Sequence, residues 1–254
     1  MRSIMVIAFN TFRENLRDKI LYNLLIFAAL LIGASILLGA LTINEQEKII
    51  ADMGLASINL IGVIIAIFVG IGLVSKEIER RTIYTILAKP ISRSQFILGK
   101  YAGLAITLAV NLVIMFAVFV FTLWMTQVPI TMVLVQAVAL MMVEFLVVTA
   151  TALFFSTFST PTLSAALTLG LYFIGHLTSD LKALAERSSS EVTTAIMTAL
   201  YYLCPNLEVL NIKGQAVSGV SLAWSYQLSA TLYGLFYASL LLAGAVAIFQ
   251  KRDF

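Results

Sequence analysis

The chain has 254 residues, of which 61% are hydrophobic and 11% are charged, and its mean hydropathy is +1.00. A soluble globular domain carries about 25% charged residues, so this chain has too little polar surface to cover a soluble fold. The net charge is only +3, and no basic patch interleaved with aromatic residues indicates nucleic-acid binding. No alternating strand pattern is present, and the composition therefore predicts an all-α integral membrane protein.

Rare residue types exclude several kinds of site. Cys204 is the only cysteine and His176 the only histidine, so an intrachain disulfide and a Cys/His zinc site are both excluded. The sequence contains neither a P-loop motif nor an HExxH motif. We therefore expect no catalytic residue, no metal site and no ATP site in this chain.

Residues 1–19 predict an amphipathic helix that lies in the cytoplasmic membrane interface and leads into the first span. Apolar residues recur at helical spacing on one face, at Met5, Phe9, Phe12, Leu16 and Ile20. Polar residues take another face, at Asn10, Arg13, Glu14 and Arg17. The following apolar run is about twice as long as the core of a signal peptide, which excludes a cleavable signal. The alternative is a merely polar tail.

Six hydrophobic segments follow, and each is read as a membrane helix. They are Ile20–Leu41, Leu55–Val74, Ala102–Met125, Met132–Phe155, Leu163–Leu181 and Leu228–Phe249. The fifth is the weakest, because His176, Ser179 and Asp180 lie near its end.

The distribution of Lys and Arg predicts the orientation. Of the 16 basic residues, 12 lie at the two ends of the chain or after the second segment, and 4 lie in the other loops. With an even number of spans, both termini are expected to be cytoplasmic, in a cell (inner) membrane.

The segment Ser75–Lys100 is a dense charged cluster between two apolar runs. Ser75 to Ala88 predicts a short cytoplasmic helix, which Pro90 ends because proline disfavours helix in the residue before it. Ser92 and Gln95 then have the spacing of a capping box that opens the third span. The alternative is a solvated loop whose charge only fixes the topology.

This segment closely resembles the signature of ATP-binding-cassette permeases of the type-2 exporter family. The matching residues are Glu77, Glu79, Thr82, Ile86, Leu87, Pro90, Ser92, Arg93, Gly99 and Lys100. Many members have Gly where this chain has Arg81, and this variant resembles the branch that includes the permease for nitrous-oxide reductase maturation. The resemblance also covers residues 1–19, the six segments and residues 201–211, so it spans nearly the whole chain as one permease domain, 1–254.

The resemblance implies a mechanism. Two permease chains pair, and each docks a separate cytoplasmic ATPase, which binds ATP and Mg²⁺. Residues 75–91 resemble the coupling helix that contacts the ATPase. The implied contact residues are Glu77, Glu79, Arg80, Arg81, Thr82, Tyr84 and Thr85.

Four polar residues within the spans are candidates for a substrate path: Glu144, Asn59, Asn111 and Gln136. An ionisable residue such as Glu144 is expensive in a membrane and faces a cavity or a partner. The alternative is a protonated Glu144 that hydrogen-bonds a neighbouring helix, with the three amides joining helices together. His176 is interpreted as an interface residue and Tyr172 as a packing residue. Gly99 and Gly103 permit close helix contact.

Residues 182–227 form the largest segment on the outer side. Ser188 and Glu191 have the spacing of a capping box, and an apolar stripe follows at Val192, Ile196, Leu200 and Leu203, before Pro205. This pattern predicts an amphipathic or re-entrant helix. It would act as a structural plug, a lid, or a dock for an extracytoplasmic protein.

Two functions remain after these exclusions. The first is the permease subunit of an ATP-driven exporter, and the second is a mechanical relay that moves an extracytoplasmic partner without transporting a solute. A secondary transporter would need more intramembrane charge. An intramembrane enzyme would need a catalytic set that this sequence lacks.

Overall fold

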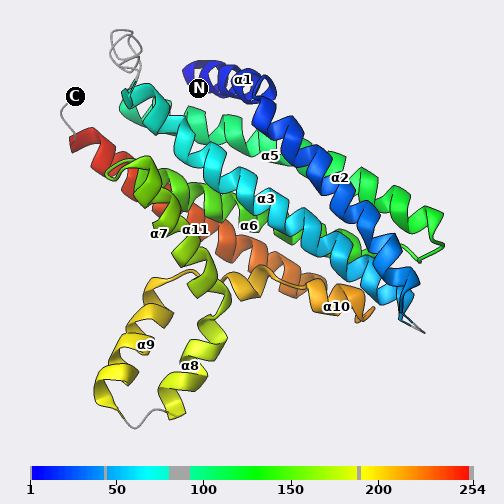
Figure 1. The fold of residues 1–254 in the computed structure, drawn as a ribbon. Helices are drawn as coiled ribbons and strands as arrows, with labels where there is room; N and C mark the ends of the chain where they lie inside the picture. The colour runs from blue at the N-terminus through cyan, green and yellow to red at the C-terminus, as the bar shows by residue number, and fades with distance from the viewer. Residues whose placement is uncertain (1, 43–44, 80–91, 188–189, 252–254) are drawn as a thin grey trace.

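The computed structural model describes residues 2–42, 45–79, 92–187 and 190–251, with residues 2 and 73–79 described by their backbone alone. Within these ranges the regular structure is entirely helical (Figure 1). The helices are α1 Arg2–Leu16, α2 Lys19–Ala40, α3 Gln46–Glu79, α5 Arg93–Met125, α6 Met132–Ser156, α7 Pro161–His176, α8 Thr178–Arg187, α9 Glu191–Leu203, the 3₁₀ turn η1 Leu207–Leu210, α10 Lys213–Val217 and α11 Trp224–Lys251. The predicted all-α membrane fold is thereby confirmed.

Five of the described helices are long and apolar enough to cross a membrane, namely α2, α3, α5, α6 and α11. They correspond to five of the six predicted spans. The helices α3 and α6 form the centre of the bundle, since 72% of the most apolar window of each is buried. In α2 and α11 that share is 22%, and these helices expose apolar residues such as Leu30 and Phe236.

The fifth predicted span, Leu163–Leu181, was wrong as a single helix. The helix α7 ends at His176 after 16 residues, and Thr178 begins α8. At about 1.5 Å per residue, α7 reaches about 24 Å, which is less than the hydrocarbon thickness of about 30 Å. The chain turns here, next to a close contact between Gly175 and Leu207. A Cβ at Gly175 would lie only 2.8 Å from the Leu207 side chain.

The predicted N-terminal helix is confirmed as α1, and it packs on α5 through small residues. A Cβ at Gly99 would lie 2.7 Å from the Ile7 side chain, and one at Gly103 would lie 2.5 Å from the carbonyl oxygen of Ala8. Met5 and Phe9 stay exposed on the other side of α1, at 77% and 56%. The glycine pair therefore joins α1 to α5 and leaves an apolar face of α1 free.

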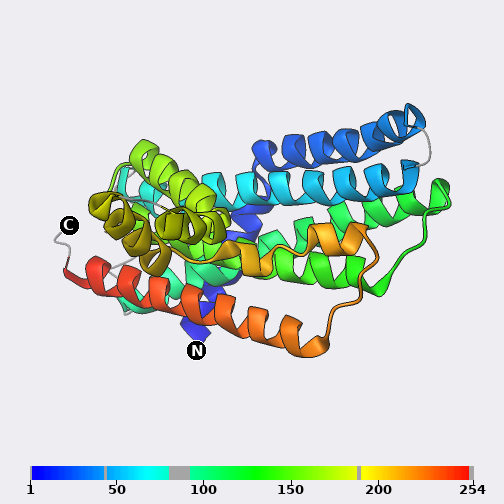
Figure 2. The ribbon, with the colours of Figure 1, turned by 90° about the horizontal axis from the view of Figure 1, so that it is seen from below.

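Both chain termini lie at one end of the bundle, which we call the terminal end (Figures 1 and 2). Arg93 at the start of α5 donates hydrogen bonds to the carbonyl oxygens of Phe249 and Gln250 in α11, at 3.1 and 3.0 Å. Lys100 of α5 lies 3.6 Å from Glu14 of α1. The ends of three helices are thus tied together here.

The predicted capping box at the start of α5 is confirmed. The Gln95 amide donates to the Ser92 hydroxyl at 3.2 Å, and the Ser92 amide donates to the Gln95 side chain at 3.3 Å. The second predicted box, from Ser188 to Glu191, was wrong in its position. The helix α9 begins at Glu191 and its N-cap is Ser190, whereas the predicted box required Ser188 as the N-cap.

The helices α8 and α9 form an antiparallel pair that projects from the side of the bundle, and we call this pair the arm (residues 178–203) (Figure 1). The helix predicted after residue 190 is present as α9. In its predicted stripe, Val192, Ile196 and Leu203 are exposed, whereas Leu200 is half-buried. After the arm, η1 and α10 continue along the bundle and contact α6.

Candidate functional site

The charged segment expected to meet an ATPase begins and ends at the terminal end of the bundle. The helix α3 continues without a break to Glu79, so the backbone of Ser75–Glu79 extends the second span. A separate helix starting at Ser75 was therefore wrong for these five positions, where the helical hydrogen bonding of the span simply continues. The side chains of Glu77 and Glu79, and the residues Arg80, Arg81, Thr82, Tyr84 and Thr85, lie outside the described part of the chain.

A second site lies in the interior of the bundle, where three helices bring four polar side chains together. The Asn59 amide nitrogen of α3 donates to Glu144 Oε2 of α6 at 2.8 Å. The Tyr172 hydroxyl of α7 donates to Asn59 Oδ1 at 3.0 Å. His176 Nε2, also on α7, lies 3.4 Å from Glu144 Oε1. We call these four residues the polar cluster.

The cluster is closed to solvent and lipid at its centre. Glu144 is 0% exposed and Asn59 is 3% exposed. Glu144 is the central residue of α6, because twelve positions separate it from Met132 and twelve from Ser156. An acidic group at this depth is tolerated because neighbouring polar groups replace the water it loses.

The geometry around His176 defines what the cluster can do chemically. His176 Nδ1 lies 3.1 Å from the Tyr172 carbonyl oxygen, and the two rings are 4.6 Å apart between centroids. With Nδ1 protonated, the ring donates to that carbonyl, and Nε2 then faces Glu144. Among the described residues neither Glu144 Oε1 nor His176 Nε2 has another hydrogen-bond partner. The pair can therefore share one proton between α6 and α7.

The structure brings together two of the four residues predicted for a substrate path. Glu144 and Asn59 are in the polar cluster, whereas Asn111 and Gln136 are buried elsewhere, at 1% and 4% exposure. Asn111 Nδ2 has no hydrogen-bond partner among the described residues. Among the described residues, no hydrogen bond joins either amide to the polar cluster. Burial of a polar side chain therefore does not by itself show that it belongs to this site.

Tyr172 and His176 were missed as members of this site. Their interpretation as a packing residue and an outer interface residue is corrected by their contacts with Asn59 and Glu144. A sequence signal for them exists, because Ser164, Thr168, Tyr172 and His176 recur every four residues in a mostly apolar helix. This spacing places one polar stripe along α7. Ser164 and Thr168 are accordingly buried.

Among the described residues, no group of three or more His, Cys, Asp or Glu side chains could hold a metal ion. The polar cluster has two such side chains, Glu144 and His176, together with an amide and a phenol. Its chemistry is that of hydrogen bonding and proton sharing.

A family model described as ABC-2 family transporter protein matches residues 5–254. The chain belongs to the ABC-2 transporter family. A search of curated protein sequences found no match. Membership covers nearly the whole length of the chain, and together with the five long apolar helices it identifies a multi-pass membrane permease subunit of an ATP-binding-cassette transporter.

Proposed function

We propose that this ABC-2 permease is the membrane subunit of an exporter driven by a separate cytoplasmic ATPase. The observation that carries the proposal is the continuity of α3 from Gln46 to Glu79. One helix bears both Asn59 of the polar cluster and the start of the charged segment. Twenty positions separate Asn59 from Glu79, or about 30 Å at 1.5 Å per residue.

The proposed mechanism follows from the way in which α7 is held. An ATPase that pushes on the charged segment moves the end of α3, and a continuous helix transmits this motion to Asn59. Asn59 and Glu144 hold α7 through Tyr172 and His176. Because polar contacts of this kind are directional, a small displacement of α3 weakens them and releases α7.

The ATPase itself is expected to be a separate protein, because the sequence contains no P-loop. The purified permease should not hydrolyse ATP, and it should co-purify with its cognate ATPase when the two are co-expressed. Robust hydrolysis by the isolated chain, after contaminating ATPases are removed, would contradict this proposal.

Two copies of the permease are expected in the complex. Within a single chain, Glu144 and Asn59 at the centre of the polar cluster are buried in the bundle, so the passage is expected between two copies. Native mass measurement of the detergent-purified complex should show two permeases with two ATPases. A fully active complex with one copy of each would rule out a passage between copies.

The terminal end is proposed to face the cytoplasm of a cell (inner) membrane. In a Cys204→Ser background, a cysteine at Ser92 should be protected from an impermeant thiol reagent in intact cells. A cysteine at Val220, between α10 and α11, should react. The reverse labelling pattern would invert the topology.

The mechanical relay differs from the exporter in needing an extracytoplasmic protein partner. A complex reconstituted into liposomes without such a protein should couple ATP hydrolysis to solute movement if it is an exporter. ATP hydrolysis that requires an added extracytoplasmic protein, with no solute movement, would favour the relay.

A further inference from the structure

The arm leaves the bundle halfway along its length. His176 is the last residue of α7 and contacts Glu144, the central residue of α6. The arm begins two residues later, at Thr178, and therefore starts at the depth of the polar cluster. Figure 1 shows it projecting across the long axis of the bundle.

Charged side chains make lipid an unsuitable environment for the arm. Five charged residues are exposed on it, namely Asp180, Lys182, Glu186, Arg187 and Glu191. A charge in the hydrocarbon region of a bilayer is costly unless it is paired or hydrated. An arm that extended into the bilayer at the depth of Glu144 would carry all five into this region.

An apolar stripe makes water an equally unsuitable environment. Val192, Ile196 and Leu203 are 69%, 54% and 73% exposed and recur along one face of α9. None of the 13 residues of α9, all of which the structure describes, is buried. A contiguous apolar face next to charged residues is typical of a protein interface.

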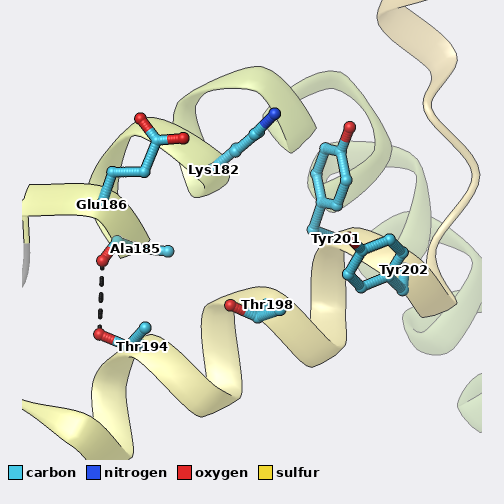
Figure 3. A pocket seen from close by; sticks show the side chains of 7 residues that line it. All are labelled: Lys182, Ala185, Glu186, Thr194, Thr198, Tyr201 and Tyr202. Atoms are coloured by element: carbon cyan, nitrogen blue, oxygen red, sulfur yellow. Dashed lines mark hydrogen bonds between the residues drawn. The ribbon is translucent and has the colours of Figure 1, made fainter.

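The two helices of the arm are held as one unit. Between them lies a cleft of about 190 Å³ whose lining includes Lys182, Glu186, Thr198 and Tyr201 (Figure 3). Lys182 Nζ lies 5.8 Å from the centroid of the Tyr201 ring, a cation–π contact. Thr194 donates to the Ala185 carbonyl oxygen at 3.3 Å. The stripe therefore lies on a pair of helices whose arrangement is already fixed within one chain.

We propose that the arm packs against the arm of a second copy of this chain, across a twofold axis in the space between the two permeases. This inference rests on the dimer of the proposed function. A twofold contact is isologous, so the stripe on each α9 meets the same stripe of the partner. The arm carries three acidic and two basic exposed residues, so each copy offers the other both signs of charge. When two arms pair, their stripes are buried against each other and their charged residues lie near one another. Lipid is unsuitable for the charges, and water leaves the stripes exposed.

Cysteine cross-linking tests this contact. In a Cys204→Ser background, Ile196→Cys places one thiol at the middle of the stripe. Val113→Cys is the matched control, because Val113 is 67% exposed and belongs to α5, a helix that lies across the bundle from the arm (Figure 1). Oxidation of the complex in membranes should convert Ile196→Cys to a covalent permease dimer and leave Val113→Cys monomeric.

Two results would overturn the proposal. Quenching of a fluorophore on Ile196→Cys by nitroxide lipids, without cross-linking, would place the stripe in the bilayer. Fast reaction with a water-soluble maleimide, again without cross-linking, would leave it in water. Native mass measurement of the same complex distinguishes a wrong arm contact from a wrong dimer. A dimer without cross-links contradicts the arm contact alone, whereas a monomer contradicts the proposed dimer as well.

A second variant tests the contact without oxidation. Ile196→Asp adds a charge at the centre of the stripe, and Ile196 is exposed within one copy, so the variant should fold. The dimer should dissociate at least tenfold more readily, whereas Ile196→Val should leave it unchanged. Equal dimer stability in both variants would contradict the contact.

Discussion

Glu144 combines complete burial with two polar partners on two different helices. The Asn59 amide satisfies one carboxyl oxygen, and His176 faces the other. Such an arrangement suits a residue that gates a path, and it suits equally a residue that holds the helices together. Substitutions distinguish these two roles, because they change charge and hydrogen bonding separately.

The first prediction concerns Glu144→Gln and Glu144→Leu. If Glu144 gates the path, Glu144→Gln should alter transport or its coupling to ATP hydrolysis, with little loss of stability. If its role is structural, Glu144→Gln should be nearly silent, and Glu144→Leu should cost about 1–3 kcal/mol, because Asn59 and His176 lose their partner. ATPase coupling and thermal unfolding in the same detergent measure both effects. An unchanged Glu144→Leu protein would contradict both roles.

Cys204 follows α9 and carries the only thiol of the chain. Burial raises the pKa of this thiol above its ordinary value. Because the thiolate is the reactive form, the thiol form dominates at neutral pH and reaction is slow.

The second prediction is that maleimide labelling of Cys204 accelerates steeply from about pH 7 to about pH 9, as the thiolate fraction grows. A cysteine introduced at the exposed Val220, in a Cys204→Ser background, should label faster at pH 7, since it lacks the burial that raises the pKa of Cys204. Equal rates for both thiols at pH 7 would show that burial does not protect Cys204.

At the scale of elements, the contact between α1 and α5 depends on two glycines. The carbonyl oxygen of Ala8 and the side chain of Thr11 occupy the space that a Cβ at Gly103 would take. Since a backbone atom cannot move aside as a flexible side chain can, a larger residue at this position must push α1 away from α5.

The third prediction is that Gly103→Ala destabilises the protein by about 1–3 kcal/mol, the usual cost of overpacking. Gly170→Ala is the matched control, because no neighbouring heavy atom lies within 4 Å of the position that a Cβ would take at Gly170 in α7. That substitution should be neutral or stabilise α7 by about 0.5–1 kcal/mol. The temperature of half-unfolding of the two variants gives the comparison. A Gly103→Ala protein as stable as Gly170→Ala would show that α1 does not depend on close packing.

At the scale of the whole molecule, the long helices link the terminal end to the polar cluster. The helices α2 and α5 leave this end, while α3, α6 and α11 return to it (Figure 1). A protein that binds the charged segment therefore acts directly on the centre of the bundle, where α3 and α6 meet.

The fourth prediction is that Glu77→Lys together with Glu79→Lys weakens ATPase binding by about tenfold or more, because desolvated charge pairs across an interface contribute strongly. The matched control is Glu45→Lys with Glu47→Lys, which makes the same change of charge at exposed positions near the other end of α3. Pull-down of the ATPase by each variant in membranes measures the effect. Equal binding by both double variants would leave the segment with a role in topology alone.

Local patterns along the chain were enough to predict the class of this protein, the existence of most elements and the family. An apolar run that is long enough to cross a bilayer can adopt few structures, so five spans could be predicted from composition and length. The capping box of Ser92 and Gln95 was equally predictable, because both partners lie within one helical turn. The charged segment led to the family through its own residue types and order.

The end of α7 and the contacts among polar residues depend instead on how the helices pack. The contact between Glu144 and His176 joins residues 32 positions apart, on two helices whose relative rotation no local pattern fixes. The helix α7 ends at His176, next to the close packing of Gly175 against Leu207, although the predicted span continued to Leu181. Asn111 and Asn59 look alike in sequence, but only the packing of α3, α6 and α7 places Asn59 beside Glu144. Local patterns determine helices, whereas the distances between side chains on different helices depend on how whole helix surfaces fit together.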